Sequence, residues 1–295
     1  MGDLTTIEAQ NLDALAQDLG TGGKSSSRVI MDELKINYDT EDDNDNTLTP
    51  GDMFIKEGGK GNTDYFYTKK VTFRPLWQVH QYSIYDPQEN KMSCRSIMIE
   101  NFREEAKDTQ GTFKCGKPSS KEMKDFTKEQ REKYKNIKNT RQLRGLLTCT
   151  ATNVRGETKE YKDFPILIKL NGQNNYQMDA NNKLFAPFES QFLNHIPNGT
   201  HLWNFNISLT TERRKNALKK SYYVYAYEPD FGNPLAVKKE HYDTVMMIKD
   251  LIASENAEIE AEYYQAVRAK SYDAEATDTL DKMHKSLDAD YEDVA

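Results

Sequence analysis

The stretch VTFRPLWQVHQYSIY, residues 71–85, decides the fold of this chain. It is rich in β-branched and aromatic residues, which is typical of a strand. Alternation divides its side chains between two faces, with Val71, Phe73, Trp77 and Val79 on one and Thr72, Arg74, Gln78, His80 and Tyr82 on the other. We expect the first face, including Trp77, to belong to the core. Pro75 has no N–H to donate, so the strand should run along an edge of the sheet or carry a bulge.

Further segments share this composition and are bounded by turn-forming residues: 28–38, 93–99, 145–154, 164–171, 201–210 and 221–229. No regular alternation of strands with helices runs through them, which favours a mostly antiparallel sheet. EGGKGNTD (57–64) is typical of a connection between two strands of a hairpin. The sequence therefore predicts an α+β protein, mostly β, with a small antiparallel barrel of the oligonucleotide-binding type.

Helices are expected in two places. Ser119 and Glu122 fit a capping box, which predicts an inserted helix over about 119–138. Apolar residues at helical spacing predict a long C-terminal helix over about 239–269: Val245, Ile248, Ile252, Ile259, Tyr263 and Val267. The chain then divides into an acidic flexible segment 1–27, a core 28–270, and an acidic tail 271–295 that is expected to be disordered because it is poor in bulky aliphatic residues.

The net charge of −7 hides an uneven distribution. Residues 1–50 carry 11 acidic and 3 basic residues, and residues 251–295 carry 12 acidic and 4 basic residues. The middle, 51–250, carries 33 basic and 24 acidic residues, with 12 of the 17 tyrosines, all 12 phenylalanines and both tryptophans. A basic, aromatic-rich core between acidic ends indicates a surface that attracts polyanions.

The segment SYYVYAYE offers the most suggestive binding pattern. Strand alternation places Tyr223, Tyr225 and Tyr227 on one face, where their rings could stack with the bases of a single strand. The alternative is that these rings pack beneath the C-terminal helix. Cations that could follow the phosphates lie just before this segment and around the other strands: Arg213, Arg214, Lys215, Lys219, Lys220, Lys69, Lys70, Arg74, Lys114, Lys117, Arg141 and Arg144, joined by Tyr82.

Motifs for catalysis are missing from the sequence. There is no HExxH pair among the five histidines, no GxSxG motif and no phosphate loop, and DTEDDNDNTLTPGD lacks the glycine and glutamate of a calcium loop. We therefore expect no catalytic residues, no cofactor and no metal, with a zinc site of Cys94, Cys115 and a histidine as the alternative. Three cysteines without a CxxC pair, no apolar run of the roughly 18 residues that a membrane span needs, and no signal peptide predict a cytoplasmic protein without disulfides.

With a basic aromatic barrel followed by an acidic tail ending DADYEDVA, the chain resembles the single-stranded DNA-binding proteins of tailed bacteriophages. KINYDTED, VTFRPL and GTFKCGK are also similar to phage proteins given that label. The resemblance implies a barrel that coats DNA during replication and recombination in an infected bacterium, and a tail that recruits replication or recombination proteins. Residues that would serve the tail's role are Asp288, Asp290, Tyr291, Glu292 and Asp293. In the podovirus examples the tail closes with an aromatic residue, whereas Val294 and Ala295 close it here.

A mobile acidic tail could also occupy the basic groove in cis until a nucleic acid displaces it. Two alternatives to single-strand binding remain open: a phage structural or assembly protein that acts through protein contacts, and a nucleic-acid-processing enzyme with scattered carboxylates. The choice between DNA and RNA and the formation of homo-oligomers also remain open.

Overall fold

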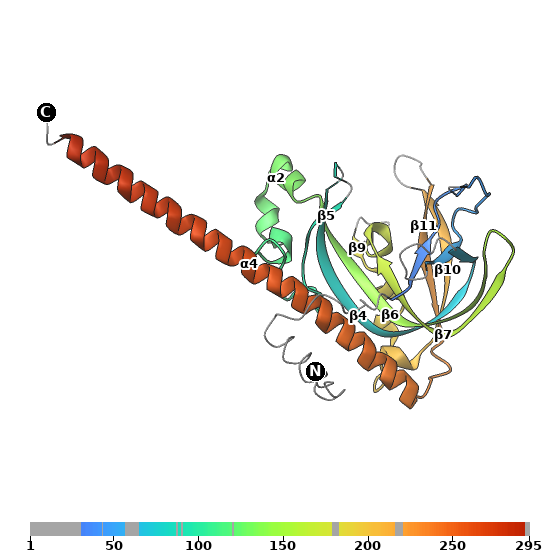
Figure 1. Cartoon of the computed structure of the whole chain (residues 1–295). Helices are drawn as coiled ribbons and strands as arrows, with labels where there is room; N and C mark the ends of the chain where they lie inside the picture. The colour runs from blue at the N-terminus through green and yellow to red at the C-terminus, as the bar shows by residue number, and fades with distance from the viewer. Residues whose placement is uncertain are drawn as a thin grey trace, which may run out of the picture. The chain divides into compact units, whose positions relative to one another are not determined.

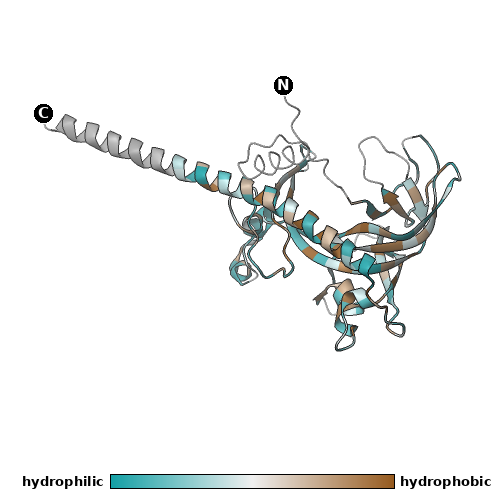
Figure 2. Ribbon diagram, turned by 60° about the horizontal axis from the view of Figure 1, so that its bottom comes forward, coloured by the Kyte–Doolittle hydropathy of each residue, from teal (hydrophilic) through white to brown (hydrophobic). Residues whose placement is uncertain are grey.

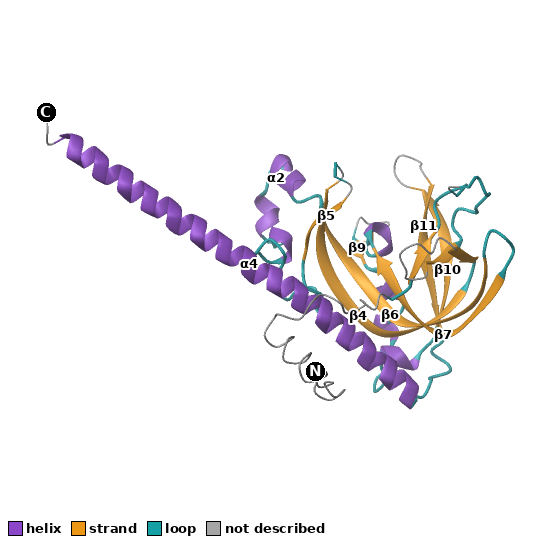
Figure 3. Ribbon diagram, in the orientation of Figure 1, coloured by secondary structure: helices purple, strands orange, loops and turns teal. Residues whose placement is uncertain are grey.

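The computed structural model shows a mixed α+β chain, mostly strands with one long C-terminal helix, as the sequence predicts (Figure 3). It describes residues 31–42, 44–56, 65–86, 88–89, 91–119, 121–178, 183–215 and 221–292, with the backbone alone for 273–292. The N-terminal segment 1–27 and the connection 57–64 lie outside the described residues. The two strands that flank this connection pair antiparallel, as a hairpin requires.

One sheet of nine strands contains β1 (Glu33–Ile36), β2 (Met53–Lys56), β3 (Tyr65–Thr68), β4 (Val71–Asp86), β5 (Lys91–Arg95), β6 (Ile137–Thr152), β7 (Thr158–Leu170), β10 (Ile207–Lys215) and β11 (Ser221–Pro229). The strand order is β11-β10-β4-β6-β3-β2-β1-β7, and β5 pairs with β4. Figure 1 shows the long strands β4, β6 and β7 beside one another. A separate pair joins β8 (Gln177–Met178) to β9 (Leu184–Phe185). Each predicted strand segment contains or overlaps a strand, whereas β2, β3, β8 and β9 lie outside these segments.

β6 is the strand at which the sheet turns back on itself. It pairs with β4 and then β3 along one edge and with β7 along the other. β7 also pairs in parallel with β1, so the pairings run β1–β2–β3–β6–β7 and return to β1. The main hydrophobic core lines these strands together with β10, β11 and α3 (Pro187–Gln191), and it includes Met53, Ile55, Phe73, Leu147, Phe188 and Leu209.

The strand of residues 71–85 is interrupted by a bulge between Pro75 and Trp77, which confirms that part of the prediction. β4 pairs with both β10 and β6, so it is a central rather than an edge strand. Gly145 faces Pro75, and a Cβ at Gly145 would lie 2.1 Å from the carbonyl oxygen of Arg74. The bulge also redirects the side chains. Phe73 lies in the main core, but Trp77 packs in a separate cluster beneath the C-terminal helix, so the predicted grouping of these two rings is wrong.

The long helix α4 (Lys239–Glu292) packs against β4 and β6 on the face opposite the main core. Ile248 is fully buried there against Leu76 and Leu146. Farther along α4, the amide side chain of Asn256 accepts a hydrogen bond from the N–H of Met98 at 2.7 Å and donates one to its carbonyl at 2.9 Å. Figure 2 shows hydrophobic residues concentrated in the strands, whereas the described part of α4 is mixed in colour. α4 therefore binds the sheet through a narrow apolar stripe and polar contacts.

The inserted helix differs from the prediction. Ser119 and Glu122 exchange the expected capping-box hydrogen bonds, but they open only a short 3-10 turn, η2 (Glu122–Asp125). A second capping box at Thr127 starts α2 (Lys128–Lys133), which has six residues. The predicted helix over 119–138 is wrong in extent because Ile137 already begins β6 and is buried there.

The C-terminal tail also differs from the prediction. α4 begins at Lys239, as expected, but it continues to Glu292, so the disorder predicted for 271–295 is wrong for 271–292. The chain contains no glycine and no proline after residue 239, and many residues of this stretch are good helix formers. A scarcity of bulky aliphatic residues argued against packing, but it did not argue against a helix.

Candidate nucleic-acid interface

The three arginines predicted to contact nucleic acid from the strands are buried. Arg74 is 6% exposed: its Nε donates to the carbonyl of Trp203 at 2.6 Å and its Nη2 to that of Ala236 at 3.0 Å. Its Nη1 also lies 3.2 Å from Nδ1 of His241, in the first turn of α4. Arg74 therefore anchors the beginning of α4 and offers nothing to a ligand.

Arg141 and Arg144 on β6 are also buried, and each pairs with a carboxylate of the same chain. Arg141 is 1% exposed and contacts the carboxylate of Glu189. Arg144 is 2% exposed, and its Nη2 lies 3.5 Å from the carboxylate of Glu255 on α4. Burial lowers the pKa of the Arg144 guanidinium, and the carboxylate of Glu255 opposes this effect. The prediction that these two cations contact phosphates is wrong.

The tyrosine row of β11 is on one face, as predicted, but that face is interior. Tyr225 and Tyr227 are 5% and 9% exposed within the main core. The hydroxyl of Tyr225 donates to the carbonyl of Leu34 at 3.2 Å, and burial raises the pKa of both tyrosines. Tyr223 is partly buried against Gly51. These rings form no stacking platform, and the element that covers them is the sheet itself rather than α4.

The remaining predicted cations fall into separate groups on different elements. Lys114 and Lys117 place their Nζ atoms 5.5 and 5.9 Å from the ring centroid of Tyr82, which is itself buried. Arg213 and Lys215 are exposed near the end of β10, and Arg214 there contacts Glu212 at 2.9 Å. The other predicted positions are as follows: Lys69 and Lys70 are exposed after β3, Lys219, Lys220 and Asp293 lie outside the described residues, and Asp288, Asp290, Tyr291 and Glu292 belong to the backbone-only part of α4.

A different aromatic surface lies on the outer side of the β2–β3 hairpin. The ring centroid of Phe54 lies 5.2 Å from that of Tyr65 and 5.8 Å from that of Tyr67, its cross-strand partner. All three rings are partly exposed, whereas Met53 and Ile55 on the other side of β2 are fully buried. We call Phe54, Tyr65 and Tyr67 the outer aromatic face.

Lysines border the outer aromatic face. Lys35 on β1 pairs with Phe54, and Lys56 on β2 pairs with Tyr65. Lys56 is exposed, as are Lys69 and Lys70 just after β3. Rings that can stack with bases and cations that can neutralise phosphates are the two components of a sequence-tolerant single-strand site.

Carboxylates limit this surface on one side. Burial raises the pKa of Tyr67, and Asp42 and Asp39 add to the effect, which places these acids within electrostatic reach of the ring. The Nζ of Lys35 also lies 3.4 Å from Glu33. The 39–42 loop would therefore repel a polyanion, and Glu33, the cross-strand partner of Lys56 on β1, adds a carboxylate on the other side of the rings.

A cavity of about 360 Å³ adjoins the outer aromatic face at the edge of β1. Lys35, Lys169, Asn171 and Asn174 line it, together with Tyr38. Lys35 thus lies between the cavity and the rings. The carboxylate of Glu33 also lines the cavity and lies 3.4 Å from Nζ of Lys35 and 3.6 Å from Nζ of Lys169, so both lysines already have an acidic partner there.

The sequence contained a signal for the outer aromatic face. The segments MFIK and YFYT have only four residues each. In a strand, Met53 and Ile55 would share one face and Phe54 the other, and Tyr65 and Tyr67 would likewise share one face. Two such segments on either side of the predicted hairpin connection are typical of its two strands. The longer SYYVYAYE segment has the stronger aromatic pattern, but two of its three predicted rings, Tyr225 and Tyr227, are buried in the main core.

No known protein family, no curated protein and no solved structure matches this chain. None of the described helices combines the length and the apolar character that a membrane crossing needs.

Proposed function

We propose that the protein binds single-stranded DNA without sequence preference, and that the outer aromatic face is where it does so. The observation that carries the proposal is the cluster of Phe54, Tyr65 and Tyr67, three partly exposed rings with centroid separations of 5.2 and 5.8 Å about Phe54. Stacking of a base on an exposed ring is worth about 1–3 kcal/mol and does not depend on the identity of the base. No catalytic residue is required for this role.

The finer part of the fold belongs to the same proposal. We take the strand circuit β1–β2–β3–β6–β7 as a small barrel that serves as an oligonucleotide-binding scaffold. In the known oligonucleotide-binding barrel, the face of the second and third strands is the binding face, and the rings here lie on the second and third strands of the circuit. The circuit follows chain order, which is a meander, whereas the known barrel is a Greek key.

The biological setting follows from the resemblance to phage proteins. The protein would coat single strands during replication or recombination in the cytoplasm of an infected bacterium, and the end of α4 would recruit a replication protein. Competition by the tail in cis needs a mobile chain, and α4 is helical to Glu292. We therefore propose partner recruitment for this end of α4, without competition in cis.

A titration of a fluorescent single-stranded oligonucleotide tests the main proposal. Replacing Phe54 and Tyr67 by Ala removes two rings, so affinity should fall at least about thirty-fold if each stacks with a base at the lower end of the known range. Tyr242→Ala is the matched control, since Tyr242 is 58% exposed on α4, away from the hairpin. Equal affinity of the double variant and the wild type would refute this location of the site.

Salt dependence gives a second measurement on the same protein. Each phosphate contact on a single strand contributes about 0.7 to the slope of log affinity against log salt. Replacing Lys35 and Lys56 by Ala should therefore lower the slope by about 1.4 while the rings still bind. An unchanged slope would separate these lysines from the phosphates, and a wild-type protein that binds no oligonucleotide at low salt would end the proposal.

The length of α4 favours a second candidate function, assembly through protein contacts. Lys270, whose Nζ donates to the carbonyl of Gln110 at 2.6 Å, is the last residue of α4 with a described contact to the rest of the chain. Residues 271–292 extend the helix by about 33 Å at 1.5 Å per residue. Light scattering on the full chain and on a chain lacking residues 274–295 tests this candidate: loss of self-association with unchanged oligonucleotide affinity would favour assembly.

A further inference from the structure

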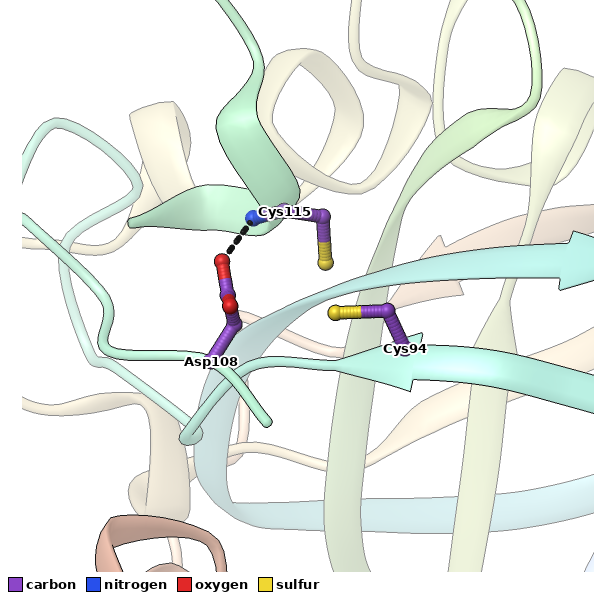
Figure 4. Close-up of side chains that lie close together, drawn as sticks. All are labelled: Cys94, Asp108 and Cys115. Carbon is purple, nitrogen blue, oxygen red and sulfur yellow. Dashed lines mark hydrogen bonds between the residues drawn. The ribbon is translucent and has the colours of Figure 1, made fainter. Parts of the chain in front are cut away.

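Three side chains that can ligate a metal ion meet beside β5, outside the outer aromatic face: Cys94, Asp108 and Cys115 (Figure 4). Their sulfur and oxygen atoms all lie within 4.8 Å of one another. The three residues are 2%, 0% and 5% exposed. Among the described residues an aspartate, and no histidine, joins the two cysteines, so the structure brings together Cys94 and Cys115 of the sequence-based alternative with a different third residue.

An uncommon backbone conformation holds Cys115 in place. Lys114, Cys115 and Gly116 have φ angles of 51°, 58° and 70° in succession, all in the left-handed region. This region costs a residue other than glycine about 1–2 kcal/mol. The turn directs Sγ of Cys115 towards Sγ of Cys94 on β5 (Figure 4). A costly conformation that brings two buried thiols together indicates a role beyond packing.

Asp108 organises this turn from within. Its Oδ1 accepts hydrogen bonds from the N–H groups of Gln110 and Thr112, at 2.9 and 3.1 Å. Its Oδ2 accepts from the Thr112 hydroxyl at 2.6 Å and from the N–H of Cys115 at 2.7 Å. These bonds occupy the carboxylate, so an oxygen becomes free for a metal only when the Thr112 hydroxyl rotates away. The two sulfurs are therefore the primary ligands, and Asp108 adds negative charge beside them.

We propose that Cys94 and Cys115 bind one thiophilic divalent cation, Zn²⁺ being the candidate, with Asp108 as the third group of the site. Tetrahedral zinc with Zn–S bonds of about 2.3 Å holds its ligand sulfurs about 3.8 Å apart. Atoms within 4.8 Å of one another need only small shifts to reach that geometry. Binding breaks two S–H bonds and forms two S–Zn bonds, and both protons leave to solvent.

Burial and shared hydrogen bonds shift the pKa values of the two thiols in opposite directions. The hydrogen bond with Cys94, burial and the nearby Asp108 all raise the pKa of Cys115. A thiolate at Cys94 accepts hydrogen bonds from Cys115 and Thr109, which lowers the pKa of Cys94.

The site supports the surface on which α4 packs. Lys107, next to Asp108, donates to Glu260 and to the hydroxyl of Tyr264, both at 3.0 Å. The ring of Phe113 lies 5.8 Å from that of Tyr263 on the same helix. A cation that ties residues 108–115 to β5 would stabilise this docking surface, so metal occupancy and the docking of α4 should be coupled.

Metal titration of the reduced, full-length chain tests the proposal. With Zn²⁺ in competition with a chromophoric chelator, the wild type should bind one ion per chain and release two protons. Co²⁺ should give a thiolate charge-transfer band, and Zn²⁺ should slow hydrogen exchange in 106–116 and 257–270. Cys94→Ser and Cys115→Ser should each weaken binding by more than about 100-fold, since changes outside the ligand set already cost about 10–100-fold. Cys149→Ser, which alters a cysteine outside the cluster, is the matched control.

Several results would overturn the proposal. One is a reduced wild type that binds neither Zn²⁺ nor Co²⁺. Another is metal binding that gives no thiolate band or that persists in the double serine variant, because the ion would then lie elsewhere. A third is a protein whose mass, as purified, is two hydrogens lower with Cys94 and Cys115 joined, because the pair would then be a disulfide. The Zn²⁺ titration and the Co²⁺ spectrum of the wild type remain decisive even if a serine variant fails to fold.

Discussion

His80 should make the protein less stable as the pH falls from about 6.5 to about 4. The side chain is 3% exposed on β4, and its Nδ1 lies 3.4 Å from Oδ1 of Asn139. Burial, followed by the charge of Arg141, lowers the pKa of His80 from 6.5 to about 4. Within this window the unfolded chain binds a proton that the folded chain does not, so the free energy of unfolding rises with pH and is lost on acidification.

The magnitude follows from the shift in pKa. One pKa unit corresponds to about 1.36 kcal/mol, so His80 costs about 2 kcal/mol at pH 5 and about 3 kcal/mol once the pH is below 4. Burial and the charge of Arg74 also lower the pKa of His241. The contribution of His80 is therefore measured as the difference between the wild type and His80→Gln.

Urea unfolding at pH 5 and pH 7, followed by the fluorescence of Trp77 and Trp203, provides the assay. The difference in the free energy of unfolding between wild type and His80→Gln should change by about 2 kcal/mol between these pH values, in favour of the variant at pH 5. His195→Gln, at an exposed histidine, is the control for the effect of replacing a histidine by glutamine. A parallel profile for His80→Gln would refute the reasoning.

Three further substitutions test the interior. Gly145→Ala should destabilise the protein by about 3 kcal/mol or more, because the new Cβ would meet the carbonyl of Arg74 at 2.1 Å; a loss under about 1 kcal/mol in chemical unfolding would show that the bulge can move. Glu255→Ala should cost about 3 kcal/mol, since it leaves Arg144 buried without its carboxylate partner, and an unchanged melting temperature would mean that water already compensates the charge. Tyr227→Phe should leave stability unchanged or raise it by about 1 kcal/mol, because the buried hydroxyl has no hydrogen-bond partner among the described residues, and a clear loss in urea unfolding would reveal one.

Sequence reasoning found the strands because composition and alternation are local properties. It placed the start of α4 at Lys239 for the same reason. It failed at Trp77, where a bulge shifts the register and sends the ring to a different core from Phe73. Pro75 predicted either an edge strand or a bulge, but the effect of the bulge on the later side chains depends on the pairing with β6, which no local pattern encodes.

The binding site was harder to predict than the fold because strand alternation separates two faces without saying which one is covered. Both faces of the Tyr225 strand contain tyrosines, and the face with the longer aromatic row proved to be interior. The thiol cluster depends even more on tertiary structure. Asp108 and Cys115 reach Cys94 only through a turn with left-handed residues, which GTFKCGK suggests by its two glycines alone.

Ion pairs within the chain account for part of the uneven charge distribution. Arg144 meets Glu255, and Lys107 meets Glu260, so bases of the middle segment pair with acids of α4. Opposite net charges on the two segments therefore favour docking of the helix on the sheet as well as attraction of a polyanion. Only cations outside this contact remain available to phosphates, and those beside the outer aromatic face also lie next to exposed rings. Dependence on Phe54 and Tyr67, rather than affinity for polyanions as such, is consequently the property that distinguishes a single-strand binder from a protein whose charges serve its own fold.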